Sequence, residues 1–282
     1  MLSIKKGIFD IIWIINIVQV AAGEYYTVGL KKNGTLIAMG YNGVNQCDVS
    51  SWTDIIKVTA GDSHTVGLKK DGTVIAVGYN NDGRCNVSNW ADISQIALGW
   101  DYTVGLKKDG TVIATGDNRY DQCNIGNWKD IIQISAGGRH TIGLKSDETV
   151  ISTGDNRYDQ CNIGNWKDII KVTTGWLHTV GLKKDGTVVA VGRSNDGQCD
   201  VGGWTDIIQI SAGEYYTVGL KKDGTAVAVG YNSSGQCDVD SWKNIIQITA
   251  GGLHTVGLKS DGTAVAVGDN YYGQCNVDYK ND

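Results

Sequence analysis

The sequence predicts an all-β fold, a seven-bladed β-propeller with four antiparallel strands per blade, on three observations. Cysteine recurs every 38 residues from Cys47 to Cys275. Tryptophan keeps the same spacing from Trp52 to Trp242, and we expect these side chains to fill the space between blades. The segment HTVGLKKDGT, which begins at His64, returns at the same interval with small changes. A fixed period of this length indicates one structural unit that is copied and stacked, and seven copies of 38 residues account for 266 of the 282 residues.

One copy of the repeat contains four segments with the character of short strands. Residues 55–60 are rich in β-branched residues, as strands are. Residues 64–69 and 73–78 are two further strands, joined by a Lys-Asp-Gly hairpin turn in which Asp-Gly tolerates the positive φ of a tight turn. Residues 84–87 are expected to form a fourth, short strand. Four antiparallel strands in about 40 residues are typical of a propeller blade.

The two ends of the repeat array predict how the ring closes. The chain starts with a first-type strand at residues 16–22 and ends after a fourth-type strand at residues 275–277. We expect these N- and C-terminal strands to share one blade, which removes an exposed sheet edge. The prediction divides the chain into an N-terminal extension at 1–15, the propeller at 16–277 and a C-terminal tail at 278–282.

The N-terminus also has features of a secretion signal. Lys5 and Lys6 precede an apolar stretch that ends at Ala21-Ala22-Gly23. However, residues 16–23 match residues 244–251 in register, so they belong to the repeat. We therefore expect a cytoplasmic protein, with secretion left open if the N-terminus acts as an uncleaved signal. A disulfide framework is not expected because equivalent cysteines lie a whole unit apart. We expect each cysteine to be a small, buried apolar side chain, and seven free thiols suit a reducing compartment.

The overall charge and composition exclude several classes of partner. The net charge is −5, which provides no general attraction to nucleic acid or to anionic lipid. No apolar run approaches the ~20 residues of a membrane span. The composition, 41% hydrophobic and 20% charged, is typical of a soluble globular protein. We expect a monomeric propeller with no nucleic-acid or membrane partner.

The repeat resembles the regulator of chromosome condensation repeat. That pattern, G-x-x-H-T-x-x-L-x-x-D-G followed by a Gly and by N-x-x-G-Q, is matched by residues 251–262, Gly268 and the segment 270–274, and the resemblance extends over residues 16–277. It implies a seven-bladed propeller closed by strands from both termini. The best-known member of the family is a guanine-nucleotide exchange factor that binds chromatin, and many relatives are protein-binding scaffolds. The short, uniform repeats leave no space for an inserted wedge, and the chain has no basic tail.

The seven copies differ mainly in two loops, one after the first strand and one after the third. Because strands run alternately up and down, both loops are expected on the same rim. All five arginines fall in or beside these loops, together with Trp100, Trp176 and most tyrosines. Trp, Tyr and Arg dominate interface energetics. The predicted partner-binding residues are Glu24, Tyr25, Tyr41, Asp62, Tyr79, Trp100, Asp101, Asp117, Arg119, Tyr120, Arg139, Asp155, Arg157, Tyr158, Trp176, Leu177, Arg193, Glu214, Tyr215, Tyr231, Tyr271 and Tyr272.

Signs of an enzyme are poor, and we expect no catalytic residue, metal or cofactor. His64 and its counterparts stand where other copies carry Tyr, which a metal ligand or a general base does not tolerate; hydrogen bonding at the strand edge is expected instead. The opposite rim repeats Lys-Lys-Asp-Gly or Lys-Ser-Asp-Gly, which indicates a solvated edge. The leading hypothesis is a non-enzymatic module that binds a protein through the variable loops. A carbohydrate-binding propeller is the alternative, and an exchange factor for a small GTPase is the second alternative.

Overall fold

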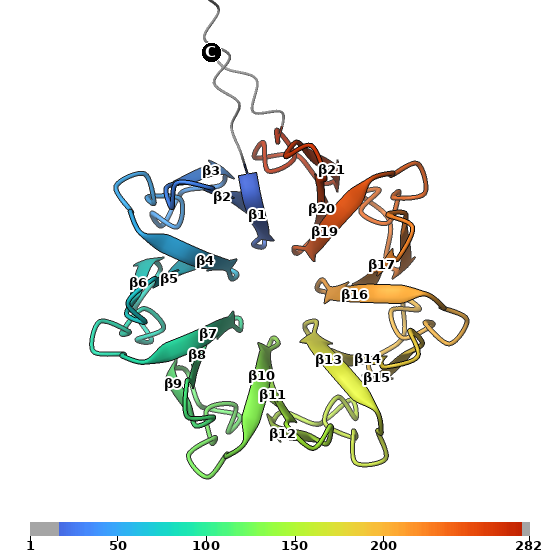
Figure 1. The fold of residues 1–282 in the computed structure, drawn as a ribbon, viewed down its shortest axis with the longest axis horizontal. Helices are drawn as coiled ribbons and strands as arrows, with labels where there is room; N and C mark the ends of the chain where they lie inside the picture. Colours follow the sequence, from blue (N-terminus) through green and yellow to red (C-terminus); the bar gives the residue numbers. More distant parts are fainter. Residues whose placement is uncertain (1–16, 278–282) are drawn as a thin grey trace, which may run out of the picture.

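The computed structural model describes residues 17–277, which form seven antiparallel sheets arranged in a ring (Figure 1). In each blade, the inner strand is the one nearest the centre of the ring. The inner strands are β1 (Ile17–Ala22), β4 (Ile55–Ala60), β7 (Ile93–Leu98), β10 (Ile131–Ala136), β13 (Ile169–Thr174), β16 (Ile207–Ala212) and β19 (Ile245–Ala250). The middle strands are β2 (Tyr26–Lys31), β5 (His64–Lys69), β8 (Tyr102–Lys107), β11 (His140–Lys145), β14 (His178–Lys183), β17 (Tyr216–Lys221) and β20 (His254–Lys259). The outer strands are β3 (Leu36–Gly40), β6 (Val74–Gly78), β9 (Val112–Gly116), β12 (Val150–Gly154), β15 (Val188–Gly192), β18 (Ala226–Gly230) and β21 (Ala264–Gly268).

Each blade consists of three consecutive strands, and we number the blades one to seven in chain order. The seven blades and the all-β class are as predicted. The predicted extension at 1–15 and tail at 278–282 lie outside the described residues. No helix in the described part of the chain is long and apolar enough to cross a membrane.

The predicted fourth strand is wrong: the segment that includes residues 84–87 forms consecutive tight turns. Its backbone groups find local partners instead of a neighbouring strand. Asn86 N donates to Gly83 O at 3.0 Å, and Val87 N donates to Cys85 O at 2.8 Å. The Asn80 side chain accepts a hydrogen bond from Cys85 N. Since these groups are already satisfied, they cannot extend the ladder of β6.

The predicted shared blade is also wrong. Strand β1 pairs with β2 in blade one, and blade seven is completed by its own inner strand, β19. The turn of three residues between β1 and β2 favours this local hairpin over pairing with a distant strand. The ring closes between two complete blades, which lie side by side in Figure 1 where the blue strands meet the red ones.

The repeated tryptophans fill the space between blades, as expected. Trp90 packs against Val66 of blade two and against Ile93 and Ile96 of blade three. A Cβ added to Gly105 in β8 would lie 2.7 Å from the Trp90 ring, so glycine at this point allows the indole to lie flat on the sheet. The apolar clusters that hold the ring together thus contain residues of two adjacent blades.

A residue at the start of each middle strand links its blade to the next one. His64, for example, is fully buried, and its Nε2 lies 2.9 Å from Thr103 Oγ1 of blade three. The Thr103 hydroxyl donates to Arg84 O, so the His64 Nε2–H is the donor to Thr103. Tyr26 makes the equivalent link, since its hydroxyl donates to the carbonyl of His64. The expected hydrogen-bonding role of the histidines is confirmed.

The inner strands carry a second link, which the sequence analysis did not find. Gln247 in β19 donates to Val20 O at 3.0 Å, and its Oε1 accepts from Val20 N at 3.1 Å. Gln133 makes the same pair of bonds to Val172 in blade five. Each of these inner strands is an edge strand of its sheet. The glutamine amide of one blade therefore satisfies free backbone groups on the inner strand of the next blade. We call this arrangement the glutamine clamp; it occurs at Gln19, Gln95, Gln133, Gln209 and Gln247, and Lys57 and Lys171 replace it in the other two copies.

All seven repeat cysteines are free thiols and only half-buried, less buried than the inert core position that the sequence analysis expected. Cys47 Sγ donates to the carbonyl of Tyr41 at 3.3 Å, and the other six make the same contact six residues back. Burial raises the pKa of Cys47 to about 12. A thiol with such a raised pKa stays protonated at neutral pH and reacts slowly.

Candidate functional site

The two variable loops of each blade lie on one rim, as predicted, and backbone hydrogen bonds hold them together. Tyr41 N, at the start of the loop after β3, donates to Tyr25 O in the loop between β1 and β2 at 2.9 Å. In blade four, Asp155 N donates to Arg139 O at 2.8 Å. The equivalent bond occurs in all seven blades. We call this side of the ring the variable rim.

The central channel opens on the variable rim through a cavity of about 130 Å³. Every blade contributes three consecutive residues: the last of the inner strand, an invariant glycine and one variable residue. The variable residues determine the chemistry of this channel mouth; in blade order they are Glu24, Asp62, Trp100, Gly138, Trp176, Glu214 and Gly252.

One wall of the channel mouth is aromatic. Trp100 of blade three and Trp176 of blade five meet with ring centroids 5.2 Å apart and planes at 83°. The two rings reach each other across blade four because that blade has Gly138 at the same position; a Cβ there would overlap the Trp176 ring. The sequence analysis did not select Gly138, although its presence at a variable position between two tryptophan copies is a visible signal.

The opposite wall is acidic and consists of Glu24, Asp62 and Glu214. Burial and the hydrogen bond and negative charge of Asp62 raise the pKa of Glu24 from 4.5 to about 9. Burial and the charge of Asp62 also raise the pKa of Glu214 to about 7. The neighbouring Tyr25 acts in the opposite direction on Glu24, and Glu24 does so on Glu214, since each lowers the pKa of the other group. Three carboxyl groups are therefore crowded at one point, and the raised pKa values of Glu24 and Glu214 favour their protonated forms.

An array of arginines and aromatic rings extends outward from the aromatic wall. The Arg139 guanidinium lies 5.4 Å from the centroid of the Trp100 ring and 4.4 Å from the centroid of the Tyr120 ring. The Arg157 guanidinium also lies over the Tyr120 ring, 5.3 Å from its centroid. On the other side Trp176 contacts Tyr215, with centroids 5.1 Å apart. The array ends at contacts of Tyr215 with Tyr231 and Arg193.

A second aromatic cluster joins blades seven and one. Tyr272 lies 5.6 Å from Tyr25 and 4.9 Å from Tyr41, measured between ring centroids. Tyr271 packs against Tyr272 at 4.8 Å and is itself 83% exposed. The structure thus brings the predicted tyrosines of the first and last copies together across the closure of the ring.

Some predicted residues have mainly structural contacts. Leu177 is only 9% exposed and Asp155 only 6%. Asp155 is held by the Arg157 guanidinium, which lowers its pKa. Arg119 pairs with Asp117 in the same way at 2.7 Å.

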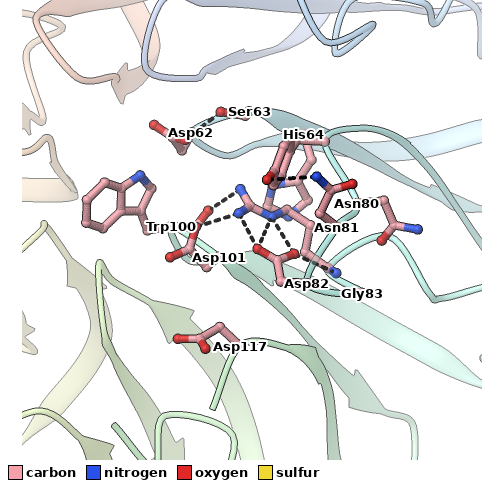
Figure 2. Close-up of polar contacts among 12 residues, drawn as sticks. Asp62, Ser63, His64, Asn80, Asn81, Asp82, Gly83, Trp100, Asp101 and Asp117 are labelled. Atoms are coloured by element: carbon pink, nitrogen blue, oxygen red, sulfur yellow. Dashed lines mark hydrogen bonds and ion pairs between the residues drawn. The ribbon is translucent and has the colours of Figure 1, made fainter. Parts of the chain in front are cut away.

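Arg84, which the prediction did not include, is a buried anchor beneath the rim. Its guanidinium forms ion pairs with Asp82 and Asp101 and donates to Trp100 O at 2.8 Å. Figure 2 shows Asp82 and Asp101 facing each other across these contacts, with the Trp100 ring beside them. Tyr79 covers the same guanidinium at 4.9 Å. Arg84 and Asp101 therefore position the Trp100 loop, whereas Tyr79 and Tyr158 remain exposed.

The opposite rim is less polar than predicted. The second residue of most inner strands lies close to the Lys-Asp-Gly hairpins, since Ile55 in β4 pairs with Lys69. This second position is aliphatic in six copies, with 42–57% of each residue exposed: Val18, Ile56, Ile132, Ile170, Ile208 and Ile246. The rim is therefore a ring of alternating charged hairpins and apolar side chains, rather than a purely solvated edge.

A closed ring of seven small antiparallel sheets defines the β-propeller class. Within it, the chain belongs to the regulator of chromosome condensation (RCC1) repeat family, because that family's model matches most of the chain. The seven matches cover residues 17–46, 55–84, 93–122, 131–160, 169–198, 207–236 and 245–274. The curated proteins contain no match to the chain.

Several solved structures share the fold at low sequence identity. Prp20p from Saccharomyces cerevisiae is 17% identical with a TM-score of 0.72, over 87% of this chain and 84% of that one. The Crinkly ectodomain of the Arabidopsis thaliana receptor kinase ACR4 is 19% identical with a TM-score of 0.71, over 89% and 96%. The ectodomain of the Physcomitrella patens receptor kinase CR4 is 18% identical with a TM-score of 0.74, over 89% and 72%. At these identities the likeness concerns the fold alone.

Proposed function

We propose that this protein is a non-enzymatic binding module that recognises a protein partner through the variable rim. The observation that carries the proposal is the array of aromatic and arginine side chains that connects Tyr120, Arg139, Trp100, Trp176 and Tyr215. These are the residue types that act as hot spots in protein interfaces. Their backbone is held by a rigid ring, so little conformational entropy is lost on binding.

The fold family supports a protein as the partner. The structure of Prp20p is described together with its binding properties to Gsp1p and histones. A second structure shows Kap60 bound to yeast RCC1 (Prp20). A protein that shares this fold therefore binds other proteins, and we extend that property to this chain and assign it to the variable rim.

The proposal of a non-enzymatic role rests on the buried histidines. Burial lowers the pKa of His64 and His178 to about 3, so both are neutral and enclosed at pH 7. Neither can therefore act as a general base, which has to be accessible and to have a pKa near the working pH. Within residues 17–277 no group of three or more His, Cys, Asp or Glu is arranged to hold a metal. The protonated thiols support a cytoplasmic location, which we retain as part of the proposal.

The test compares the two rims. A partner is captured from the native host, and its affinity is measured by calorimetry for Trp100→Ala and Arg139→Ala and, as matched controls, for Lys70→Glu and Lys108→Glu on the opposite rim. We expect each variable-rim substitution to cost about 1–4 kcal/mol of binding, as hot spots do. The lysine substitutions are expected to change affinity little, because solvated charges contribute weakly.

If the lysine variants lose binding and the Trp100 and Arg139 variants do not, the opposite rim is the interface and the proposal is wrong. A glycan array and a nucleotide-release assay with small GTPases cover the two alternative functions. Saturable binding of a glycan that Trp100→Ala abolishes would assign the rim to carbohydrate instead. Accelerated nucleotide release would assign it to exchange.

A further inference from the structure

The channel mouth combines two indoles and three carboxyl groups. Among the residues of 17–277 that line the cavity are Trp100, Trp176, Glu24, Asp62 and Glu214, but no Lys, Arg or His. We infer that the mouth accepts an ammonium group on an aliphatic stem, namely a lysine side chain of the protein partner. This inference rests on the proposed function, because it names the group that the partner inserts.

The volume of the cavity decides between a side chain and a larger ligand. Sites for drug-sized molecules usually measure about 300–1,000 Å³. The cavity here measures about 130 Å³ and is open to the rim. It is therefore too small for a metabolite of that size and large enough for one extended side chain that enters along the channel axis.

The aromatic wall suits the stem and the charge of a lysine. Trp100 and Trp176 meet at 83°, so they form a corner with two faces at right angles. Methylene groups pack on such faces, and an ammonium within about 6 Å of an indole centroid is attracted by the ring. Arg139 stacks on both Trp100 and Tyr120, so its guanidinium lies on the outward side of the array. It is not among the residues that line the cavity.

The acidic wall supplies the counter-charge. Burial and the negative charge of Asp62 both add to the cost of ionising Glu24 and Glu214. The other polar groups near them include Ser63, whose hydroxyl donates to Asp62 Oδ2, and Tyr25, which lowers the pKa of Glu24. Arg84 is already paired with Asp82 and Asp101. An inserted ammonium would be attracted to this cluster and would favour its ionised form. Binding is therefore accompanied by proton release, and affinity increases with pH.

The experiment uses the full chain and a defined probe, Nα-acetyl-lysine methylamide, with the Nε-acetylated compound as the neutral control of similar length. Binding is followed by the NMR shifts of the indole N–H groups. We expect saturable binding of the lysine probe at pH 8 and at least tenfold weaker binding at pH 5. We also expect at least tenfold weaker binding of the neutral probe.

Three variants identify the site. Trp176→Ala and Glu214→Gln are each expected to lower the affinity for the lysine probe at least fivefold. Asp196 is a rim carboxylate outside the mouth, and Asp196→Asn is expected to leave the affinity unchanged. Circular dichroism tests whether each variant is folded. If Trp176→Ala does not fold, Glu214→Gln still tests the inference. Absence of saturation, equal binding of the neutral probe, or no effect of Glu214→Gln would overturn the inference. Failure here leaves the proposed function standing if Trp100→Ala and Arg139→Ala still abolish binding of the captured partner.

Discussion

Four buried histidines occupy a position that holds tyrosine in the other three copies, and both side chains bridge to the next blade. His140 Nε2 lies 2.9 Å from Thr179 Oγ1, and the Tyr102 hydroxyl donates to His140 O at 2.6 Å. Each histidine donates through Nε2, and within residues 17–277 its Nδ1 has no partner. A histidine used in this way has to remain neutral, because no group accepts a second proton. Burial accordingly lowers the pKa of His140 to about 4.

The lowered pKa predicts a loss of stability in acid. Histidine has a pKa near 6.5 in the unfolded chain, so between pH 6.5 and 4 the unfolded state binds a proton that the folded state does not. Stability therefore falls as the pH drops through this window. Replacing His140 by Tyr, as in blade three, removes the effect at one site. Between pH 7 and pH 4, the free energy of unfolding is expected to fall on the order of 2–3 kcal/mol less in His140→Tyr than in the natural protein.

Urea unfolding at pH 7 and pH 4 measures this difference. His140 is the suitable position because it is followed in the next blade by a histidine, as Tyr26 and Tyr102 are. Equal losses for the two proteins would show that the pKa of His140 is not lowered in the folded state, because the contribution of the carboxyl groups is common to both proteins.

At the scale of the element, the inner strands have a free edge that the glutamine clamp covers. Gln19 donates to Val58 O at 2.7 Å and accepts from Val58 N at 3.1 Å, so one side chain satisfies two backbone groups of the next blade. Lys57 offers a donor only, and burial lowers its pKa. The edge groups of Ile96 opposite it therefore lack the acceptor that a glutamine provides.

This difference predicts a stabilising substitution. Lys57→Gln is expected to complete the clamp between blades two and three and to raise the free energy of unfolding by about 0.5–1.5 kcal/mol. Gln133→Lys is the matched control and is expected to lower stability by a similar amount. Both changes can be measured by urea unfolding at pH 7. If neither substitution changes the free energy of unfolding, or if Gln133→Lys increases it, the glutamine clamp does not contribute to stability.

At the scale of the whole molecule, the ring closes by the kinds of link that join other blades. Gln247 clamps Val20, His254 Nε2 lies 2.9 Å from Thr27 Oγ1, and Gly252 N donates to Gly23 O at 3.2 Å. Ile17, Val20 and Ala22 also pack in one apolar cluster with Val256, Leu258 and Ala264 of blade seven. Strand β1 thus takes part in its own sheet and in the closure, in addition to the clamp of Gln19 on Val58 of blade two.

Removal of β1 is expected to abolish all of these contacts. Deletion of residues 1–22 leaves β2 with a free edge and exposes the apolar cluster of blade seven, so we expect aggregation or loss of cooperative unfolding. Deletion of residues 1–8 is the control and is expected to leave the thermal transition unchanged. Light scattering and calorimetry provide the measurements. A stable, cooperatively unfolding monomer that lacks residues 1–22 would contradict the role of β1 in closure.

Features that depend on neighbouring residues could be predicted from the sequence. The 38-residue period determined the number of blades, and the Asp-Gly turns located the hairpins. Trp90 and its counterparts were expected between blades, since a large apolar side chain at a fixed position needs a surface to cover. The common rim followed from the alternation of strand direction, so the positions of Trp100, Trp176 and Arg139 on one side were foreseen.

Features that depend on which residues meet across blades were determined only by the tertiary structure. The shared closing blade and the fourth strand were wrong, because local turns satisfied the backbone groups that those pairings required. The meeting of Trp100 and Trp176 depends on Gly138, and the raised pKa of Glu24 depends on Asp62 one blade away. The sequence by itself therefore determined the repeating unit and the side of the ring on which its variable residues lie. The contacts, burial and charge of the channel mouth were decided by the ring, because it brings residues 38 or more positions apart within a few ångströms of one another.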